Sequence, residues 1–239
     1  MLGLGNTILS DYKPVFLNNY SLQFHGSDDY LNCDEIVDLI STAEGSISLW
    51  TKIDTTTSTG NIFRMQSDSD NFISIFYHAG SNETRTTYKG GGSAVTAVSR
   101  AAIEGDGNWH HIVSTWNTTA NELKLYLDGS LIQTKPNTGS LPTFGDEPTT
   151  ADIAQNTAGS SYFKGFVDEV GIFDETLTLA EITEIYNGGE PNDIGLTSAR
   201  PKLQVYHRFE IGSGTETKDN FGETLGILVN TPTWSTDTP

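Results

Sequence analysis

One stretch in the last third of the chain is a strand that leads directly into a helix: residues 163–189, FKGFVDEVGIFDETLTLAEITEIYNGG. Side chains of a strand alternate between its two faces, with a period of two. By that period, one face carries Phe166, Asp168, Val170 and Ile172. An apolar face is a costly place for a carboxylate without a partner. The stretch therefore predicts a largely buried strand with an unusual acid, Asp168, at its centre.

The helix that follows has a complete start signal. Thr178 can serve as the N-cap, and Glu181, three residues later, completes a capping box. Gly188 can end the helix in the left-handed conformation. We therefore expect one short helix over residues 178–187.

Elsewhere the chain consists of short runs of alternating apolar and polar residues that end at turn residues. The clearest run is 122–128, and Asp128–Gly129 then marks a tight hairpin turn. The runs 61–66 and 71–78 flank a polar turn in the same way. Many short strands with one peripheral helix predict an all-β, two-sheet antiparallel sandwich. The residues expected to fill the space between its sheets are Leu49, Trp50, Ile112, Trp116, Leu123, Leu125 and Leu127.

Charge and composition exclude several classes of partner. The chain has 13 Lys and Arg against 31 Asp and Glu, a formal net charge of −18, which disfavours nucleic acid and anionic membranes. No apolar run approaches the roughly 20 residues that span a bilayer, so no membrane insertion is expected. Cys33 is the single cysteine, so no intrachain disulfide can form. The first residues lack the pattern of a cleaved secretion signal, which favours a protein made in a cytoplasm; the alternative is an extracellular protein exported without a cleaved signal.

Five motifs occur in a characteristic order: SLQFHGSDDYLNC, SISLWTKI, GNWHHIVSTWN, LKLYLDG and GFVDEVGIFDETLTLAEITEIYNGG. This order resembles the laminin-G-like jelly roll of the concanavalin A-like lectin and glucanase superfamily. The resemblance covers residues 20–190 and implies two curved antiparallel sheets packed face to face. Residues 1–19 would then be an N-terminal arm, and residues 191–239 a connector and C-terminal segment.

The C-terminal segment is similar to the part that precedes the first core strand in many relatives. It is either a permuted edge strand that folds back onto the same sandwich or the stump of a second repeat. A stump alone would bury little apolar surface. We therefore expect residues 191–239 to pack back on the sandwich.

The resemblance also bears on catalysis. Glucanases of the superfamily carry the pattern Glu-x-Asp-x-x-Glu on one strand, and this chain has no such run. Asp168 and Glu169 are adjacent in a strand and are expected to point to opposite faces, whereas a retaining glycosidase needs its carboxyls about 5–5.5 Å apart. His110 and His111 lie in a predicted strand, where packing or hydrogen bonding is the usual role. We therefore expect a non-catalytic protein.

A calcium site is implied by the resemblance. Many relatives hold Ca²⁺ between a turn, here Asp28 and Asp29, and the late strand, here Asp168. Calcium takes six to eight oxygen ligands, but His25 stands where relatives often have Asp, which removes one of them. The alternative is that Asp168 accepts hydrogen bonds inside the sandwich or pairs with His25.

Glycan binding would use aromatic rings beside polar loops. Tyr77, Tyr88 and Tyr162 lie in such places. The alternative is that they are ordinary strand and rim aromatics, and no pattern selects one sugar.

The pattern of the C-terminal segment, YHRFEIGSGT followed by LVNTPTWSTDTP, is similar to bacteriophage structural proteins that carry this module. The resemblance implies a non-catalytic virion surface protein, such as a capsid decoration, fibre or tail component. It would be a homo-oligomer, with a trimer favoured, that contacts capsid or tail proteins and cell-surface glycans. A stand-alone carbohydrate-binding lectin is the first alternative, and a glycoside hydrolase is the second.

Overall fold

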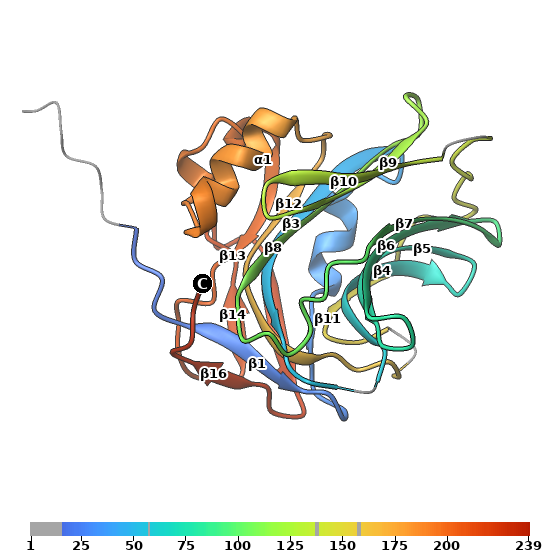
Figure 1. Ribbon diagram of the computed structural model, residues 1–239. Helices are drawn as coiled ribbons and strands as arrows, with labels where there is room; N and C mark the ends of the chain where they lie inside the picture. Colours follow the sequence, from blue (N-terminus) through green and yellow to red (C-terminus); the bar gives the residue numbers. More distant parts are fainter. Residues whose placement is uncertain (1–15, 57, 137–138, 157–158) are drawn as a thin grey trace, which may run out of the picture.

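Two antiparallel sheets face one another across an apolar core, which confirms the predicted all-β sandwich (Figure 1). The computed structural model describes residues 16–56, 58–136, 139–156 and 159–239. Within these ranges each sheet has eight strands. The first fifteen residues of the expected N-terminal arm lie outside the described residues.

Sheet A contains, in spatial order, β10 (Ser130–Lys135), β9 (Glu122–Leu127), β8 (His110–Asn117), β3 (Glu44–Ile53), β12 (Lys164–Phe173), β1 (Ser21–His25) and β16 (Thr233–Ser235), and β13 (Leu203–His207) pairs with the second half of β12. Sheet B contains β14 (Glu216–Lys218), β15 (Leu225–Val229), β2 (Tyr30–Asn32), β11 (Thr150–Ile153), β4 (Gly60–Asp68), β5 (Asn71–His78), β6 (Glu83–Gly90) and β7 (Ser93–Ser99).

The helical elements are short. They are α1 (Leu179–Tyr186) and the 3-10 turns η1 (Asp34–Leu39), η2 (Asn187–Gly189), η3 (Ile194–Leu196) and η4 (Arg200–Lys202). In the part of the chain that the structure describes, no helix has the length and apolarity needed to cross a membrane.

The core between the sheets contains six of the seven residues expected there: Leu49, Ile112, Trp116, Leu123, Leu125 and Leu127. The prediction was wrong for Trp50. Because neighbouring side chains of a strand face opposite ways, Leu49 pointing inward turns Trp50 outward. There its ring stacks on Tyr186 of α1, with the ring centroids 5.8 Å apart.

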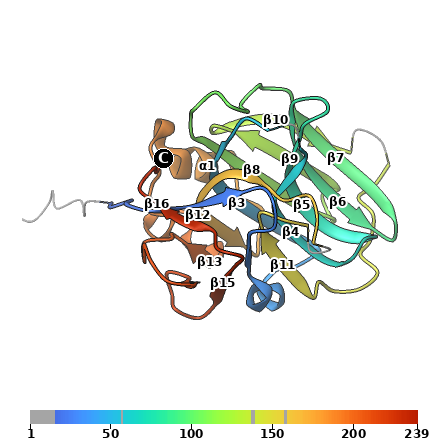
Figure 2. The same cartoon turned by 90° about the horizontal axis from the view of Figure 1, so that it is seen from below.

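Residues 203–235 supply strands to both sheets. In sheet A, β13 pairs with β12 and β16 pairs with β1. In sheet B, β15 pairs with β2 and β14 with β15. Figure 2 shows these strands in orange and red along one side of the sandwich. The C-terminal segment is thus part of the sandwich edge.

A β-bulge interrupts β12 at Glu169. The register of β12 on β3 shifts between Asp168 and Gly171, and Glu169 has φ of +49°. A bulge inserts one extra residue, so the side chains before and after it no longer alternate regularly. Val167 and Val170 consequently both face the core.

The bulge corrects two sequence predictions. Phe166 and Asp168 do not share a face with Val170; they lie on the outer side of sheet A, where Phe166 contacts the Lys52 ammonium, 4.5 Å from its ring centroid. Asp168 and Glu169 do not point to opposite faces either. Glu169 accepts a hydrogen bond from Tyr206, a residue of the outer apolar cluster beneath α1.

Helix α1 begins as the capping box predicts. The Thr178 hydroxyl accepts from the Glu181 N–H at 3.3 Å, and the Glu181 carboxylate accepts from the Thr178 N–H at 2.7 Å. The end differs from the expectation by one residue. Asn187 is the left-handed C-cap, with φ of 48°, and Gly188 follows it, also at positive φ.

Replacing the cap residue tests how much this start signal contributes. Thr178→Ala is expected to lower the free energy of unfolding by about 1 kcal/mol, because the Glu181 N–H loses its acceptor. Thr183→Ala in the same helix is the control. It is expected to change stability little, because Ala has the higher helix propensity. Urea unfolding of both variants measures the difference, and equal effects would contradict a specific capping role.

Candidate functional site

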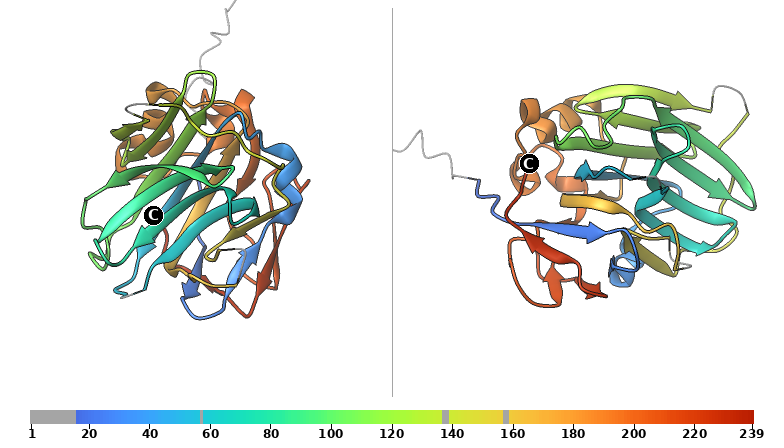
Figure 3. Two further views of the ribbon diagram at one scale, coloured as in Figure 1. Left: turned by 90° about the vertical axis from the view of Figure 1, so that its right-hand side faces the viewer. Right: turned by 60° about the horizontal axis from the view of Figure 1, so that its bottom comes forward.

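A row of polar side chains crosses the outer face of sheet B, one from each of six adjacent strands. Strand register places its members side by side. The polar row consists of Asn32 (β2), Asp152 (β11), Arg64 (β4), Ser74 (β5), Thr87 (β6) and Thr96 (β7). Figure 3, left, views the molecule from the side on which β4 to β7 lie. The alternate residues of these strands, such as Phe63 and Ile75, fill the core.

Two aromatic residues flank the polar row. Phe72 and Phe76 lie two positions either side of Ser74 on β5, and both are half-buried. The Arg64 guanidinium lies over the Phe72 ring, 3.6 Å from its centroid. Aromatic rings offer an apolar face, which suits the C–H face of a sugar ring. The adjacent polar groups suit its hydroxyls.

The Asp152 end of the row is a buried hydrogen-bonded cluster. Asp152 is 3% exposed, and its two oxygens accept from Asn32 at 3.4 Å and from Gln155 at 3.0 Å. Burial raises the pKa of Asp152 to about 7. The Gln155 Oε1 and the Ser74 hydroxyl have no hydrogen-bond partner among the described residues. Both residues are buried, Ser74 being 1% and Gln155 4% exposed, so a ligand on this face does not reach these two atoms directly.

The raised pKa of Asp152 makes stability depend on pH. Between about pH 4, where an unfolded Asp titrates, and pH 7, the folded chain holds a proton that the unfolded chain releases. Stability therefore falls as pH rises through this window, and Asp152→Asn is expected to make the fall less steep. Urea unfolding at pH 4.5 and 7.5 tests this, with the exposed Asp70 exchanged for Asn as control. Parallel slopes for the wild type and Asp152→Asn would contradict the prediction.

Two of the three tyrosines expected to bind glycans are buried, and for Tyr162 the assignment stays a prediction. Tyr77 and Tyr88 are 3% and 1% exposed and belong to the core between the sheets, and the Tyr88 hydroxyl donates to the Thr42 carbonyl at 2.7 Å. Their assignment as sugar-stacking residues was wrong, because a ligand cannot reach them. Tyr162 is half-buried and lies near Tyr30. The pKa of Tyr30 is raised by burial and by nearby Asp152.

The three carboxylates expected to bind calcium do not come together. Asp29 is buried and accepts from the backbone N–H and the ring Nδ1 of His25, at 2.7 and 2.9 Å, while Asp28 is exposed. Strand pairing sets His25 opposite Lys164, four residues and about 13 Å along β12 from Asp168. A shared ion and the alternative pairing of His25 with Asp168 are therefore both at odds with the geometry. Across residues 16–239, leaving out those not described, no group of three or more His, Cys, Asp or Glu is placed to hold a metal ion.

Asp168 and Glu169 instead form a sealed acidic pair on the outer side of sheet A. They are 0% and 1% exposed. Burial, and then the neighbouring Glu169, raise the pKa of Asp168 well above its ordinary value; burial raises the pKa of Glu169 to about 8. Tyr206 and Arg208 both donate to Glu169. No substrate can reach either carboxyl directly.

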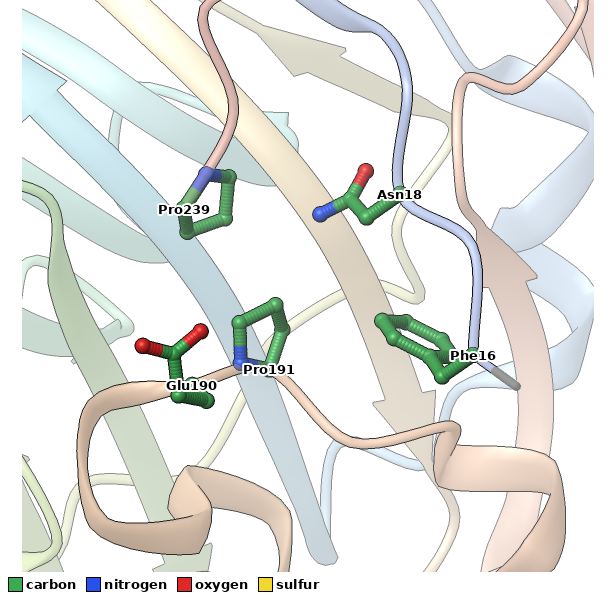
Figure 4. Close-up of a pocket in the computed structure, with 5 residues that line it drawn as sticks. All are labelled: Phe16, Asn18, Glu190, Pro191 and Pro239. Atoms are coloured by element: carbon green, nitrogen blue, oxygen red, sulfur yellow. The ribbon is translucent and has the colours of Figure 1, made fainter. Parts of the chain in front are cut away.

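A pocket of about 330 Å³ lies on the outer side of sheet A, between the two ends of the described chain and the loop after α1 (Figure 4). Its lining consists of Phe16, Asn18, Glu190, Pro191 and Pro239. The Asn18 amide is close enough to influence the pKa of Asp168. The polar atoms of Asn18 and the Oδ2 of Asp168 make no hydrogen bond with the described residues. The lining mixes apolar rings with the polar groups of Asn18 and Glu190, and these come from a chain end and a loop rather than from adjacent paired strands.

Comparisons with known proteins identify the family of the chain and proteins that share its fold. The sequence profile of the family described as Concanavalin A-like lectin/glucanases superfamily matches residues 25–183. No curated protein matches the chain significantly in sequence.

Three solved structures illustrate the fold. The carbohydrate-binding module CBM40 of a Ruminococcus gnavus IT-sialidase, bound to alpha2,3 sialyllactose, has a TM-score of 0.59 and 12% identity over 70% of this chain and 96% of that one. A putative carbohydrate binding protein from Bacteroides ovatus has a TM-score of 0.64 and 14% identity over 92% of this chain, which spans only 61% of that protein. A heptameric SAP-like pentraxin from Limulus polyphemus has a TM-score of 0.56 and 18% identity over 74% and 87% of the two chains. At these identities the likeness concerns the fold alone.

Proposed function

The chain belongs to the Concanavalin A-like lectin/glucanases superfamily, and on that premise we propose that it is a non-catalytic glycan-binding module. Its binding surface would be the polar row of sheet B together with Phe72 and Phe76. The observation that carries the proposal is the row of outward polar residues across one sheet face, with the half-buried Arg64 guanidinium and the half-buried Phe72 and Phe76 rings within it. Two structural neighbours are described as carbohydrate-binding, one of them with a bound sialyllactose.

The acids near the row support binding rather than hydrolysis. Glycoside hydrolysis needs two carboxyls that flank the scissile bond. Asp152 is held by Asn32 and Gln155. Asp34, the carboxylate nearest to it in this network, accepts from the Ala151 N–H and the Asn32 amide, both at 2.9 Å. Both acids therefore hold neighbouring strands together. If the chain released reducing sugar from a glycan, and Asp152→Asn abolished that release, the non-catalytic assignment would be overturned.

A glycan array followed by calorimetry with a selected glycan tests the binding surface. Phe76→Ala is expected to weaken binding about tenfold because a stacking ring is lost, and Phe72→Ala by a similar factor because the ring on which Arg64 lies is lost. Phe221→Ala is the matched control, since Arg200 stacks on that half-buried ring at 4.3 Å, far from sheet B's outer face. Equal losses in all three variants, or no glycan bound at all, would contradict the proposal.

A virion role is a second proposal, and it rests on the C-terminal sequence pattern alone. In that setting the module would be displayed as a homo-oligomer, a trimer being favoured, on capsid or tail proteins. Mass spectrometry of purified phage particles is expected to find the chain, and sedimentation of the purified protein is expected to give three copies. Absence from particles would end this proposal without affecting glycan binding.

A further inference from the structure

Arg64 is a half-buried guanidinium that lacks an anionic partner. Its Nε donates to Gln66, but its two terminal nitrogens make no hydrogen bond or ion pair with the rest of the described chain. Burial lowers its pKa to about 10. A partly desolvated charge is costly unless it is paired, and this chain has 31 acidic residues from which a partner could have come.

The acid opposite Arg64 on the neighbouring strand is bonded to other residues. Asp152 is its partner in the β11–β4 register, yet both Asp152 oxygens are taken by Asn32 and Gln155. The other basic residues on this face have acidic partners. Arg85 pairs with Glu83, and Lys89 with Asp70.

The surroundings hold the Arg64 side chain in a defined orientation. The Phe72 ring packs against the guanidinium, whose central carbon lies 3.6 Å from the ring centroid. The Gln66 side chain accepts a hydrogen bond from its Nε. A guanidinium held in this way presents its two terminal nitrogens as a rigid fork, which matches the planar, bidentate geometry of a carboxylate.

We propose that the glycan bound by sheet B is an acidic sugar, and that its carboxylate binds the two terminal nitrogens of Arg64. This inference rests on the glycan-binding function proposed above. The same sugar then extends along this sheet face toward the half-buried Phe76 ring, two positions beyond Ser74 on β5. The carboxylate of the ligand is then the anionic partner that Arg64 lacks among the described residues.

The test compares acidic glycans with their carboxyl-reduced forms, which differ only in that a carboxylate has become a CH₂OH group. The wild-type chain is expected to prefer the acidic form about tenfold or more, as a charge-assisted bidentate contact allows. Arg64→Gln is expected to bind both forms equally and weakly. Arg64→Lys, which keeps the charge but loses the fork, is expected to fall between them. Arg85→Gln, at an ion-paired neighbour, is expected to keep the full preference.

The possible outcomes separate the two proposals. If the wild-type chain binds acidic and reduced glycans equally, and Phe76→Ala weakens both, the Arg64 inference is overturned and glycan binding stays intact. A preference that Arg64→Gln does not change would also overturn it. Failure to bind any glycan would remove both. Because Arg64 makes a single hydrogen bond within the described chain, Arg64→Gln is expected to melt within a few degrees of wild type, which a thermal scan checks.

Discussion

Removing residues 203–239 is expected to abolish cooperative folding of the chain. The deletion takes away β13 and β16 from sheet A and β14 and β15 from sheet B, leaving β12, β1 and β2 with unpaired edges. It also removes several buried apolar side chains, among them Leu203, Val205, Tyr206 and Phe209. At about 1.5–3 kcal/mol for each buried apolar side chain, these four alone contribute roughly 6–12 kcal/mol. That is comparable to the whole stability of a typical domain, about 5–15 kcal/mol.

Thermal unfolding followed by circular dichroism measures this effect. A shorter deletion, residues 236–239, is the control, because it keeps all four strands and removes mainly the contacts of Asp237 with Lys52 and Trp109. The control is expected to unfold cooperatively at a moderately lower temperature. A cooperative transition of the longer deletion at the full-length Tm would show that the C-terminal strands are dispensable.

Arg208→Met is expected to destabilise the chain more at high pH than at low pH. Arg208 is the basic residue that donates to buried Glu169, and its charge lowers the pKa of Glu169, which burial raises to about 8. Below pH 5 Glu169 is protonated in the folded chain, so the loss of Arg208 costs little. At pH 9 the Glu169 carboxyl of the variant is either buried as an uncompensated carboxylate or kept protonated well above its ordinary pKa. Either state lowers the free energy of unfolding by about 3 kcal/mol.

The sign follows from proton linkage. The folded-state pKa of Glu169 lies above its unfolded value of about 4.3, so its contribution to stability is complete below that value and is lost as pH rises through 8. Arg208→Met raises the folded pKa further and extends the loss to higher pH. Urea unfolding at pH 5 and pH 9 measures it, and the double variant with Glu169→Gln is expected to lose the added pH dependence. Equal destabilisation of Arg208→Met at both pH values would point to packing alone.

The strands and the helix were predictable because their signals are local. Asp128–Gly129 takes positive φ at both positions of the β9–β10 turn, as the dipeptide predicts, and the capping box marks the start of α1. The alternation of side chains along β5 also predicts which of its residues are buried, and the assignment of Tyr77 did not use it. Tyr77 shares its face with Ile73 and Ile75, and that pattern already places Tyr77 in the core.

The bulge and the site had no comparable local signal. Glu169 adopts a positive φ that glycine usually takes, so nothing in VDEVG marks the change of face. The polar row depends on strand order. Asn32 and Asp152 are 120 residues apart in sequence and meet through the pairing of β2 with β11. Each member of the row is an ordinary outward polar residue of its own strand, and only the pairing of six strands brings them into one line.

Nuclear magnetic resonance titration shows directly whether the outer face of sheet B binds glycan. An isotope-labelled chain is titrated with an acidic glycan while backbone amide shifts are followed. We expect the largest shifts in a continuous band across β11, β4, β5 and β6, at Asp152, Arg64, Ser74 and Thr87. Shifts gathered instead around Asn18 and Glu190 at the pocket of sheet A, or no saturable shifts with any glycan, would contradict glycan binding by sheet B.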